Sequence, residues 1–268
     1  MRKLIVAVLV GAGCCLVAAG AGVAADMPVK AKPAAAPGYN WTGWYVGGNV
    51  GYGWGRDTGG LWDGVADPDN LGFPQSFGIG GNVLPGVKPS GIVGGAQVGY
   101  NWQLARSWVV GVVADLQASD MHATASNTVT PGVFATTIQS NSARIDWFGT
   151  LRGRAGFASD NWLFYATGGL AYGGVKSDLG YRCVNCLPPG IWSGSTSATN
   201  IGWAAGAGVE VGLTRNWTVG VEYLHFDLGT VSATAVLVNN AAGFGRVTFT
   251  AGSAFAGDIV RGSVNYRF

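Results

Sequence analysis

The chain has 268 residues, of which 11% are charged, and it contains 46 glycines and 11 tryptophans. Soluble globular proteins average about 25% charged residues and about 7% glycine, so three other classes fit better: a low-complexity segment, a solenoid or a membrane barrel. The formal net charge is only +2, which gives no basic surface to suggest nucleic acid as a partner.

The first 25 residues have the organisation of a secretory signal peptide. Arg2 and Lys3 precede an apolar stretch over Leu4–Val23, and small residues continue to Ala25, which is followed by Asp26. A charged start, an apolar stretch and a small-residue cleavage site are the three parts of such a signal. The sequence therefore predicts Sec-type export, with cleavage between Ala25 and Asp26.

Two alternatives to a cleaved signal are disfavoured. An uncleaved membrane anchor does not explain the small residues at the cleavage site, and lipoprotein processing at Cys14 would need a large aliphatic residue in place of Gly11. Removing residues 1–25 removes two of the 16 basic residues and no acid, so the mature chain carries 14 of each sign. Residues 26–40, rich in Pro, Ala and Lys, are expected to form a flexible periplasmic linker.

After the linker, eight segments alternate between apolar and polar or small residues with a period of two. Each has about 10 to 15 residues, near the ~9–11 that a tilted strand needs to cross a bilayer. The segments are Trp41–Gly55, Ile92–Gln103, Trp108–Ala118, Ile145–Phe157, Trp162–Gly174, Ile201–Leu213, Trp217–Phe226 and Asp258–Phe268.

The alternation leaves one face of each segment without charge. In Ile201–Leu213, the apolar positions include Trp203 and Val209, whereas the opposite face carries Gly206 and Glu210. In Ile145–Phe157, the same analysis assigns Ile145 and Trp147 to the apolar face and Asp146 to the other. Lipid outside and a filled lumen inside explain both faces. The sequence predicts an all-β fold: an eight-stranded antiparallel up-and-down transmembrane β-barrel over residues 41–268.

The gaps between these segments alternate strictly between long and short. The short gaps are 104–107, 158–161 and 214–216, and the long gaps are 56–91, 119–144, 175–200 and 227–257. Outer-membrane barrels have short periplasmic turns and longer extracellular loops, so this order predicts the orientation. Tryptophans and tyrosines lie near both ends of the segments, as expected for aromatic girdles at the two membrane interfaces.

Few residues of the mature chain could carry chemistry. His122 and His225 each lie close to an aspartate, but no G-x-S-x-G motif accompanies them, so a protease or lipid deacylase is disfavoured. Cys183 and Cys186 lack the two further ligands that zinc would need. In an oxidising compartment a local disulfide between them is expected. The sequence therefore predicts no enzyme, metal or cofactor.

The inward face carries a balanced set of charges. They are Asp115, Arg152, Arg154, Glu210, Glu222 and Arg261, three of each sign. Eight strands leave a lumen just wide enough for side chains to fill, and unpaired charges there are costly. We expect Glu222 and Arg261 to pair on neighbouring strands, with Arg152 facing them, so that ion pairs close the lumen. A small diffusion channel remains the alternative.

Five segments carry a resemblance to a known family: 41–55, 146–157, 161–173, 220–229 and 264–268. They resemble the small outer-membrane β-barrel proteins of alphaproteobacteria, namely the Brucella surface antigens and their rhizobial relatives. The likeness covers nearly all of residues 41–268 apart from the loops. The resemblance implies an abundant barrel that supports envelope integrity and presents loops to a host, without catalytic residues. His225 departs from the family pattern, which has a second tyrosine there.

The last strand fits the signal that barrel-assembly machinery recognises. Arg261, Tyr266 and Phe268 match its polar and aromatic positions, whereas the glycine lies one place early at Gly262, with Ser263 in its position. Expected partners are therefore this machinery, outer-membrane lipid and lipopolysaccharide, and host surface molecules at the loops. The expected location is the outer membrane.

Overall fold

The computed structural model describes residues 39–56, 63–65, 85–130, 136–185, 189–238 and 248–268. The described residues form the strands β1 (Gly43–Gly55), β2 (Asp63–Val65), β3 (Ser90–Gln103), β4 (Trp108–Val129), β5 (Thr137–Ser159), β6 (Trp162–Cys183), β7 (Gly190–Gly212), β8 (Trp217–Leu237) and β9 (Thr248–Arg267). No helix in this part of the chain could cross a membrane. The predicted signal peptide, with Ala25 and Asp26, lies outside the described residues, as does most of the predicted linker.

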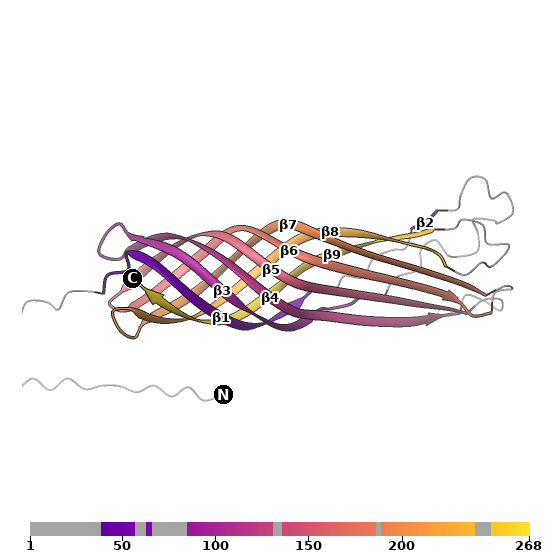
Figure 1. The fold of residues 1–268 in the computed structure, drawn as a ribbon, viewed down its shortest axis with the longest axis horizontal. Helices are drawn as coiled ribbons and strands as arrows, with labels where there is room; N and C mark the ends of the chain where they lie inside the picture. Colours follow the sequence, from indigo (N-terminus) through magenta and orange to yellow (C-terminus); the bar gives the residue numbers. More distant parts are fainter. Residues whose placement is uncertain (1–38, 57–62, 66–84, 131–135, 186–188, 239–247) are drawn as a thin grey trace, which may run out of the picture. The chain divides into compact units, whose positions relative to one another are not determined.

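Eight of these strands form a closed antiparallel ring in chain order, which β9 completes by pairing with β1 (Figure 1). Following the paired positions once around the ring leads from Tyr45 to Gly55, ten residues further along β1. A stagger of this kind goes with strands tilted by about 35–45° from the barrel axis. The predicted eight-stranded up-and-down barrel is confirmed. The short strand β2 pairs with β9 further up, on the same edge of β9 that pairs with β1 lower down.

The strands on the extracellular side are longer than the alternation predicts. Three of the four long gaps, 119–144, 175–200 and 227–257, are in large part paired β-structure, because β4 to β9 have 20 to 23 residues each. Since a spanning strand needs only ~9–11 residues, each of these strands continues well beyond the bilayer. We call the part of the barrel above the membrane the extension.

Side-chain burial confirms the two faces of the wall. Val50 and Ile201 face outward with 63% and 74% of their surface exposed, whereas Val93 faces inward and is fully buried. Seven outward tryptophans of the described residues, 40–60% exposed, lie towards the two ends of the spanning strands: Trp44, Trp54, Trp102, Trp108, Trp162, Trp203 and Trp217. Their indole rings belong at membrane interfaces because they are apolar with one polar N–H group.

We call the outward positions between the two aromatic rings the apolar belt. On β4 the belt runs from Trp108 to Ala118, which is eleven residues. On β8 it runs only from Trp217 to Tyr223, seven residues, before the polar His225 follows. The belt is therefore shorter on one side of the barrel than on the other.

A β-bulge between Ile145 and Trp147 overturns one predicted face assignment. Ile145 was expected to face outward and Asp146 inward. In the structure Ile145 is only 3% exposed and belongs to the core, whereas Asp146 contacts Lys176 on the outer surface. An extra residue in one strand reverses the side-chain alternation above it. The paired segment of β4 is irregular at the same level, between Ala118 and Met121.

Candidate functional site in the lumen

A cap closes the periplasmic end of the lumen. Trp41, at the start of the described chain, is fully buried, and its backbone N–H donates to Gln103 at 2.9 Å. Arg267, on the last strand, stacks over Tyr39 and Trp41 and donates to the backbone oxygen of Asn40 at 2.7 Å. The sequence analysis assigned Tyr39 and Asn40 to the linker, and Trp41 and Arg267 to spanning segments. It therefore did not predict a cap. The available signal for the cap was the alternation of the last strand, which places Arg267 on the inward face.

Above the cap lies a first ion pair. Arg154 on β5 donates to Glu210 on β7 at 2.9 Å, and its guanidinium carbon lies 3.9 Å from the centre of the Tyr165 ring. Tyr45 accepts a hydrogen bond from Arg154 at 3.2 Å, and Thr218 donates to Glu210 at 2.5 Å. Side chains from β1, β5, β6, β7 and β8 thus meet in the middle of the lumen.

The second set of charges forms a closed four-membered network. Arg152 donates to Asp115 at 2.9 Å and to Glu222 at 2.7 Å. Arg261 donates to the same two carboxylates at 2.9 and 2.8 Å. We call these four residues the charge ring. All four side chains are nearly buried, with at most 11% exposure.

The charge ring joins opposite walls of the barrel. Asp115 and Arg152 come from β4 and β5, whereas Glu222 and Arg261 come from β8 and β9. The expected pairing of Glu222 with Arg261, with Arg152 opposite, is present in the structure. Asp115 completes the ring, and Thr150 supports it by donating to Asp115 and accepting from Arg152, each at 2.8 Å. The alternation of the sequence places Thr150 on the polar inward face, but its contact with the charge ring was not predicted.

Apolar side chains fill the lumen above the charge ring. Phe148 and Phe226 pack with their ring centres 5.2 Å apart inside a cluster of buried residues from several strands. Higher still, in the extension, Tyr181 stacks on Phe249 at 4.8 Å and Trp192 packs against both rings. The extension therefore has its own hydrophobic core, which the sequence analysis did not predict.

The remaining candidates lie outside the lumen. His225, considered with Asp227 from sequence, instead contacts Asp258 on β9 at 2.8 Å, and Tyr223 donates to the same oxygen at 2.6 Å. His122 lies 3.5 Å from Asp120. No cluster of three or more potential metal-ligating side chains occurs in the described part of the chain.

Two further predicted features involve the ends of strands. Cys183, the last residue of β6, is bonded in a disulfide. Its expected partner, Cys186, lies outside the described residues, so this pairing stays a prediction. In the predicted assembly signal, Tyr266 and Phe268 face outward and pack edge to face at 5.4 Å, whereas Arg261 faces inward and belongs to the charge ring.

The chain is similar over nearly its whole length to known outer-membrane proteins. Residues 14–268 match the family model described as outer membrane protein beta-barrel domain. The 31 kDa outer-membrane immunogenic protein of Brucella melitensis biotype 1 is 34% identical, and the match covers 92% of this chain and 93% of that protein. The 22 kDa outer membrane protein of Rhizobium leguminosarum bv. viciae is 30% identical, over 76% of this chain and 69% of that protein.

Solved outer-membrane barrels align at low sequence identity. The outer membrane protein OprG of Pseudomonas aeruginosa aligns at 12% identity and a TM-score of 0.39, over 85% of this chain and 97% of that chain. The outer membrane protease OmpT of Escherichia coli aligns at 10% identity and a TM-score of 0.42, over 83% and 97%. The family match and the closed barrel agree: the chain belongs to the outer membrane protein β-barrel family and is an outer-membrane protein.

Proposed function

We propose that this protein is a structural, non-conducting barrel that reinforces the outer membrane and holds its extension at the cell surface. The observation that carries this proposal is the charge ring, which joins opposite walls of the lumen through four buried ion-pair contacts. The cap below it and the apolar core above it support the same conclusion. A solute would have to displace all three.

Energetics favour a permanently closed lumen. Separating a buried ion pair strands charges in a medium of low dielectric, which costs about 3–5 kcal/mol for each pair broken by losing one partner. An eight-stranded barrel has no spare width into which the side chains could retreat. Opening would therefore require breaking several buried contacts at once.

The rival function is a small diffusion channel, and one observation favours it. The lower half of the lumen is lined by polar and charged side chains, such as Asn101 and Arg154, as a water-filled pore would be. A pore would, however, need a continuous polar path. The aromatic side chains of Phe148 and Phe226 interrupt such a path above the charge ring.

Planar-bilayer recording distinguishes the two functions. The purified mature protein should give no steady conductance in conditions where a 16-stranded porin, as positive control, gives clear steps. Steady nanosiemens-scale channels from the wild-type protein, unchanged by Glu222→Ala, would overturn the closed lumen and support the channel.

A second experiment addresses envelope integrity. A strain lacking the protein should become more sensitive to detergents and to large antibiotics that the outer membrane normally excludes. Expression of the wild-type barrel should restore resistance, and so should a variant in which the exposed carboxylate Asp178 is removed. Unchanged sensitivity of the deletion strain would argue against reinforcement of the membrane.

A further inference from the structure

Three neighbouring strands carry a row of basic side chains on the outer surface. His122 on β4 lies opposite Arg144 on β5, and Arg144 lies opposite Lys176 on β6. All three side chains face outward, with 63%, 57% and 47% of their surface exposed. We call these residues the cation row.

Two members of the cation row carry a local surplus of positive charge. Arg144 and Lys176 share one carboxylate, Asp146, which Lys176 contacts at 2.7 Å. Two cations against one acid leave one positive charge on β5 and β6. Asp120, next to His122, adds a negative charge on β4 that is balanced only when His122 is protonated. Because Arg144 and Lys176 are both exposed, they are accessible to a second anion.

The row lies directly above the outer aromatic ring. The indole of Trp147 lies against Gly174, two residues below Lys176, and packs on the ring of Tyr172 at 6.0 Å. Aromatic rings of this kind mark the level of the lipid headgroups. The cation row therefore lies at the depth where the phosphates of the outer leaflet lie.

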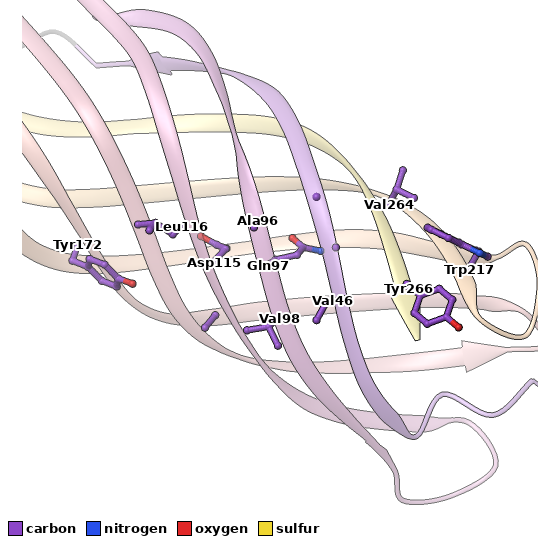
Figure 2. Close-up of a pocket in the computed structure, with 13 residues that line it drawn as sticks. Val46, Ala96, Gln97, Val98, Asp115, Leu116, Tyr172, Trp217, Val264 and Tyr266 are labelled. Carbon is purple, nitrogen blue, oxygen red and sulfur yellow. The ribbon is translucent and has the colours of Figure 1, made fainter. Parts of the chain in front are cut away.

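A shallow groove runs along the apolar belt below this level. Tyr172, Leu116, Ala96, Gly48 and Val264 line it, and Figure 2 shows the labelled side chains spread over several neighbouring strands. The floor is low where Gly48 and Ala96 face each other across β1 and β3. A Cβ atom on Gly48 would meet only one atom within 4 Å, a backbone oxygen 3.7 Å away. The groove is thus open to lipid. Asp115, the charged residue among those that line it, directs its carboxylate into the lumen towards Arg152 and Arg261.

Above the cation row, the outer wall of the extension is rich in hydroxyl groups. Six such outward residues on β4, β5 and β7 are Thr124, Ser126, Ser142, Ser193, Ser195 and Ser197. Lys176 lies opposite Ser197, so the hydroxyl wall begins beside the row. The charged outward residues of β6 above the row are Asp178 and Arg182. Hydroxyl groups both donate and accept hydrogen bonds, as the hydroxyls of a saccharide do.

We propose that the outer face of β4 to β7, together with the groove that continues over β3, β1 and β9, is a docking surface for a phosphorylated glycolipid of the outer leaflet. An acyl chain lies along the groove, a phosphate binds Arg144 and Lys176 next to Asp146, and sugars contact the hydroxyl wall. Apolar, cationic and hydroxylated zones follow one another in the order in which such a lipid presents its own parts. A phospholipid would use only the lower two zones. The surface is independent of the charge ring, so it does not depend on whether the lumen conducts.

Binding of purified bisphosphorylated lipid A to the detergent-solubilised protein tests this surface, with native mass spectrometry as the readout. The double variant Arg144→Gln/Lys176→Gln should bind about tenfold more weakly, because two charge-assisted hydrogen bonds are lost. The matched control is Arg56→Gln/Lys88→Gln, which removes the same charge from exposed positions at the extracellular ends of β1 and β3, away from the cation row and the hydroxyl wall. It should stay within about twofold of the wild type. Heat-modifiable gel migration verifies that each variant is folded.

A second variant is expected to bind lipid A more tightly than the wild type, which makes the test more specific. Asp146→Asn removes the anion that competes for both cations, so it should strengthen lipid A binding several-fold. Fully dephosphorylated lipid A should bind the wild type and the double variant alike. Equal loss of binding in the double variant and its control would overturn the proposal. So would phosphatidylglycerol that binds as tightly as lipid A, because the site would then recognise anionic lipid in general.

Discussion

At the scale of single residues, Glu222 contacts both arginines of the charge ring. Its carboxylate accepts hydrogen bonds from Arg152 and Arg261 at 2.7 and 2.8 Å, and from Tyr165 at 2.9 Å. Glu222→Ala leaves Asp115 as the carboxylate that both guanidinium groups must share. We expect the free energy of unfolding to fall by about 3–5 kcal/mol, because one partner of buried ion pairs is lost. Urea unfolding of the protein refolded into vesicles, followed by tryptophan fluorescence, measures it.

The control for this substitution is Asp178→Ala, which also removes one carboxylate. Asp178 faces outward on the extension and is exposed, so its loss should change the free energy of unfolding by no more than about 0.5 kcal/mol. If both variants unfold at the same urea concentration, the charge ring does not stabilise the barrel.

Two adjacent glycines offer a second comparison at this scale. A Cβ atom on Gly169 would collide with the backbone of Leu151 and Arg152, whereas one on Gly168 would meet only a single oxygen 3.7 Å away. Gly169→Ala should therefore destabilise the barrel by about 1–3 kcal/mol through overpacking. Gly168→Ala should be neutral or should stabilise it slightly, since alanine restricts the unfolded chain. The same urea assay compares them, and equal effects would show that the two faces tolerate a methyl group equally.

At the scale of elements, the end of β9 is expected to matter more for assembly in cells than for the stability of the folded barrel. Phe268 is 74% exposed, and its backbone N–H donates to Trp44 at 3.1 Å. Since little packing is lost, deleting Phe268 should lower the free energy of unfolding in vesicles by less than about 1 kcal/mol. In cells the same deletion should leave most of the protein uninserted, because the terminal aromatic is the predicted assembly signal.

The gel migration of unboiled outer-membrane fractions measures insertion in this experiment. Leu213→Ala is the control, because Leu213 is also an exposed apolar residue near the periplasmic end, 62% exposed, but lies outside the last strand. Normal insertion of the deletion variant at native expression would contradict the predicted signal. Equal losses in vesicles and in cells would show a simple packing effect.

The strands also show how far a sequence can be interpreted. Two-residue alternation assigns the faces of Ile201–Leu213 correctly, because lipid and lumen demand different side chains at successive positions. The same rule fails at Ile145, because a bulge depends on how two strands pair and leaves no mark in one of them. The alternation rule also missed the upper half of β7. There serine and threonine replace the apolar outward residues, so the sequence has the composition of a loop.

At the scale of the whole molecule, orientation can be tested with single cysteines. Ser195, on the outer wall of the extension, and Arg106, in a short turn, are both exposed. Ser195→Cys should react with a membrane-impermeant maleimide on intact cells, whereas Arg106→Cys should react only after the outer membrane is permeabilised. The wild-type protein provides the background, since Cys183 is bonded in a disulfide. The reverse labelling pattern would place the extension in the periplasm.

The six lumen charges could be predicted from sequence because a narrow barrel forces inward charges to balance and to meet. The contacts of Glu222 with Arg261 and Arg152 were expected, but those of Asp115 and the separate pair of Arg154 with Glu210 were not, since shear decides which strands face each other across the lumen. The cap was missed for a different reason. Tyr39 and Asn40 were expected to belong to a flexible linker, and only the structure shows that they lie with Trp41 against Arg267.

The unequal height of the apolar belt has a consequence for the surrounding membrane. The belt is four residues shorter on β8 than on β4, which is a difference of about 9 Å at roughly 2.3 Å of height per tilted residue. The bilayer must thin beside β8 or the whole barrel must lean to compensate, and either deformation carries an elastic cost. When two copies lie with their β8 sides next to each other, they share one region of deformed lipid. Two separate copies would each maintain such a region. The membrane itself is thus expected to give neighbouring copies a preferred mutual orientation.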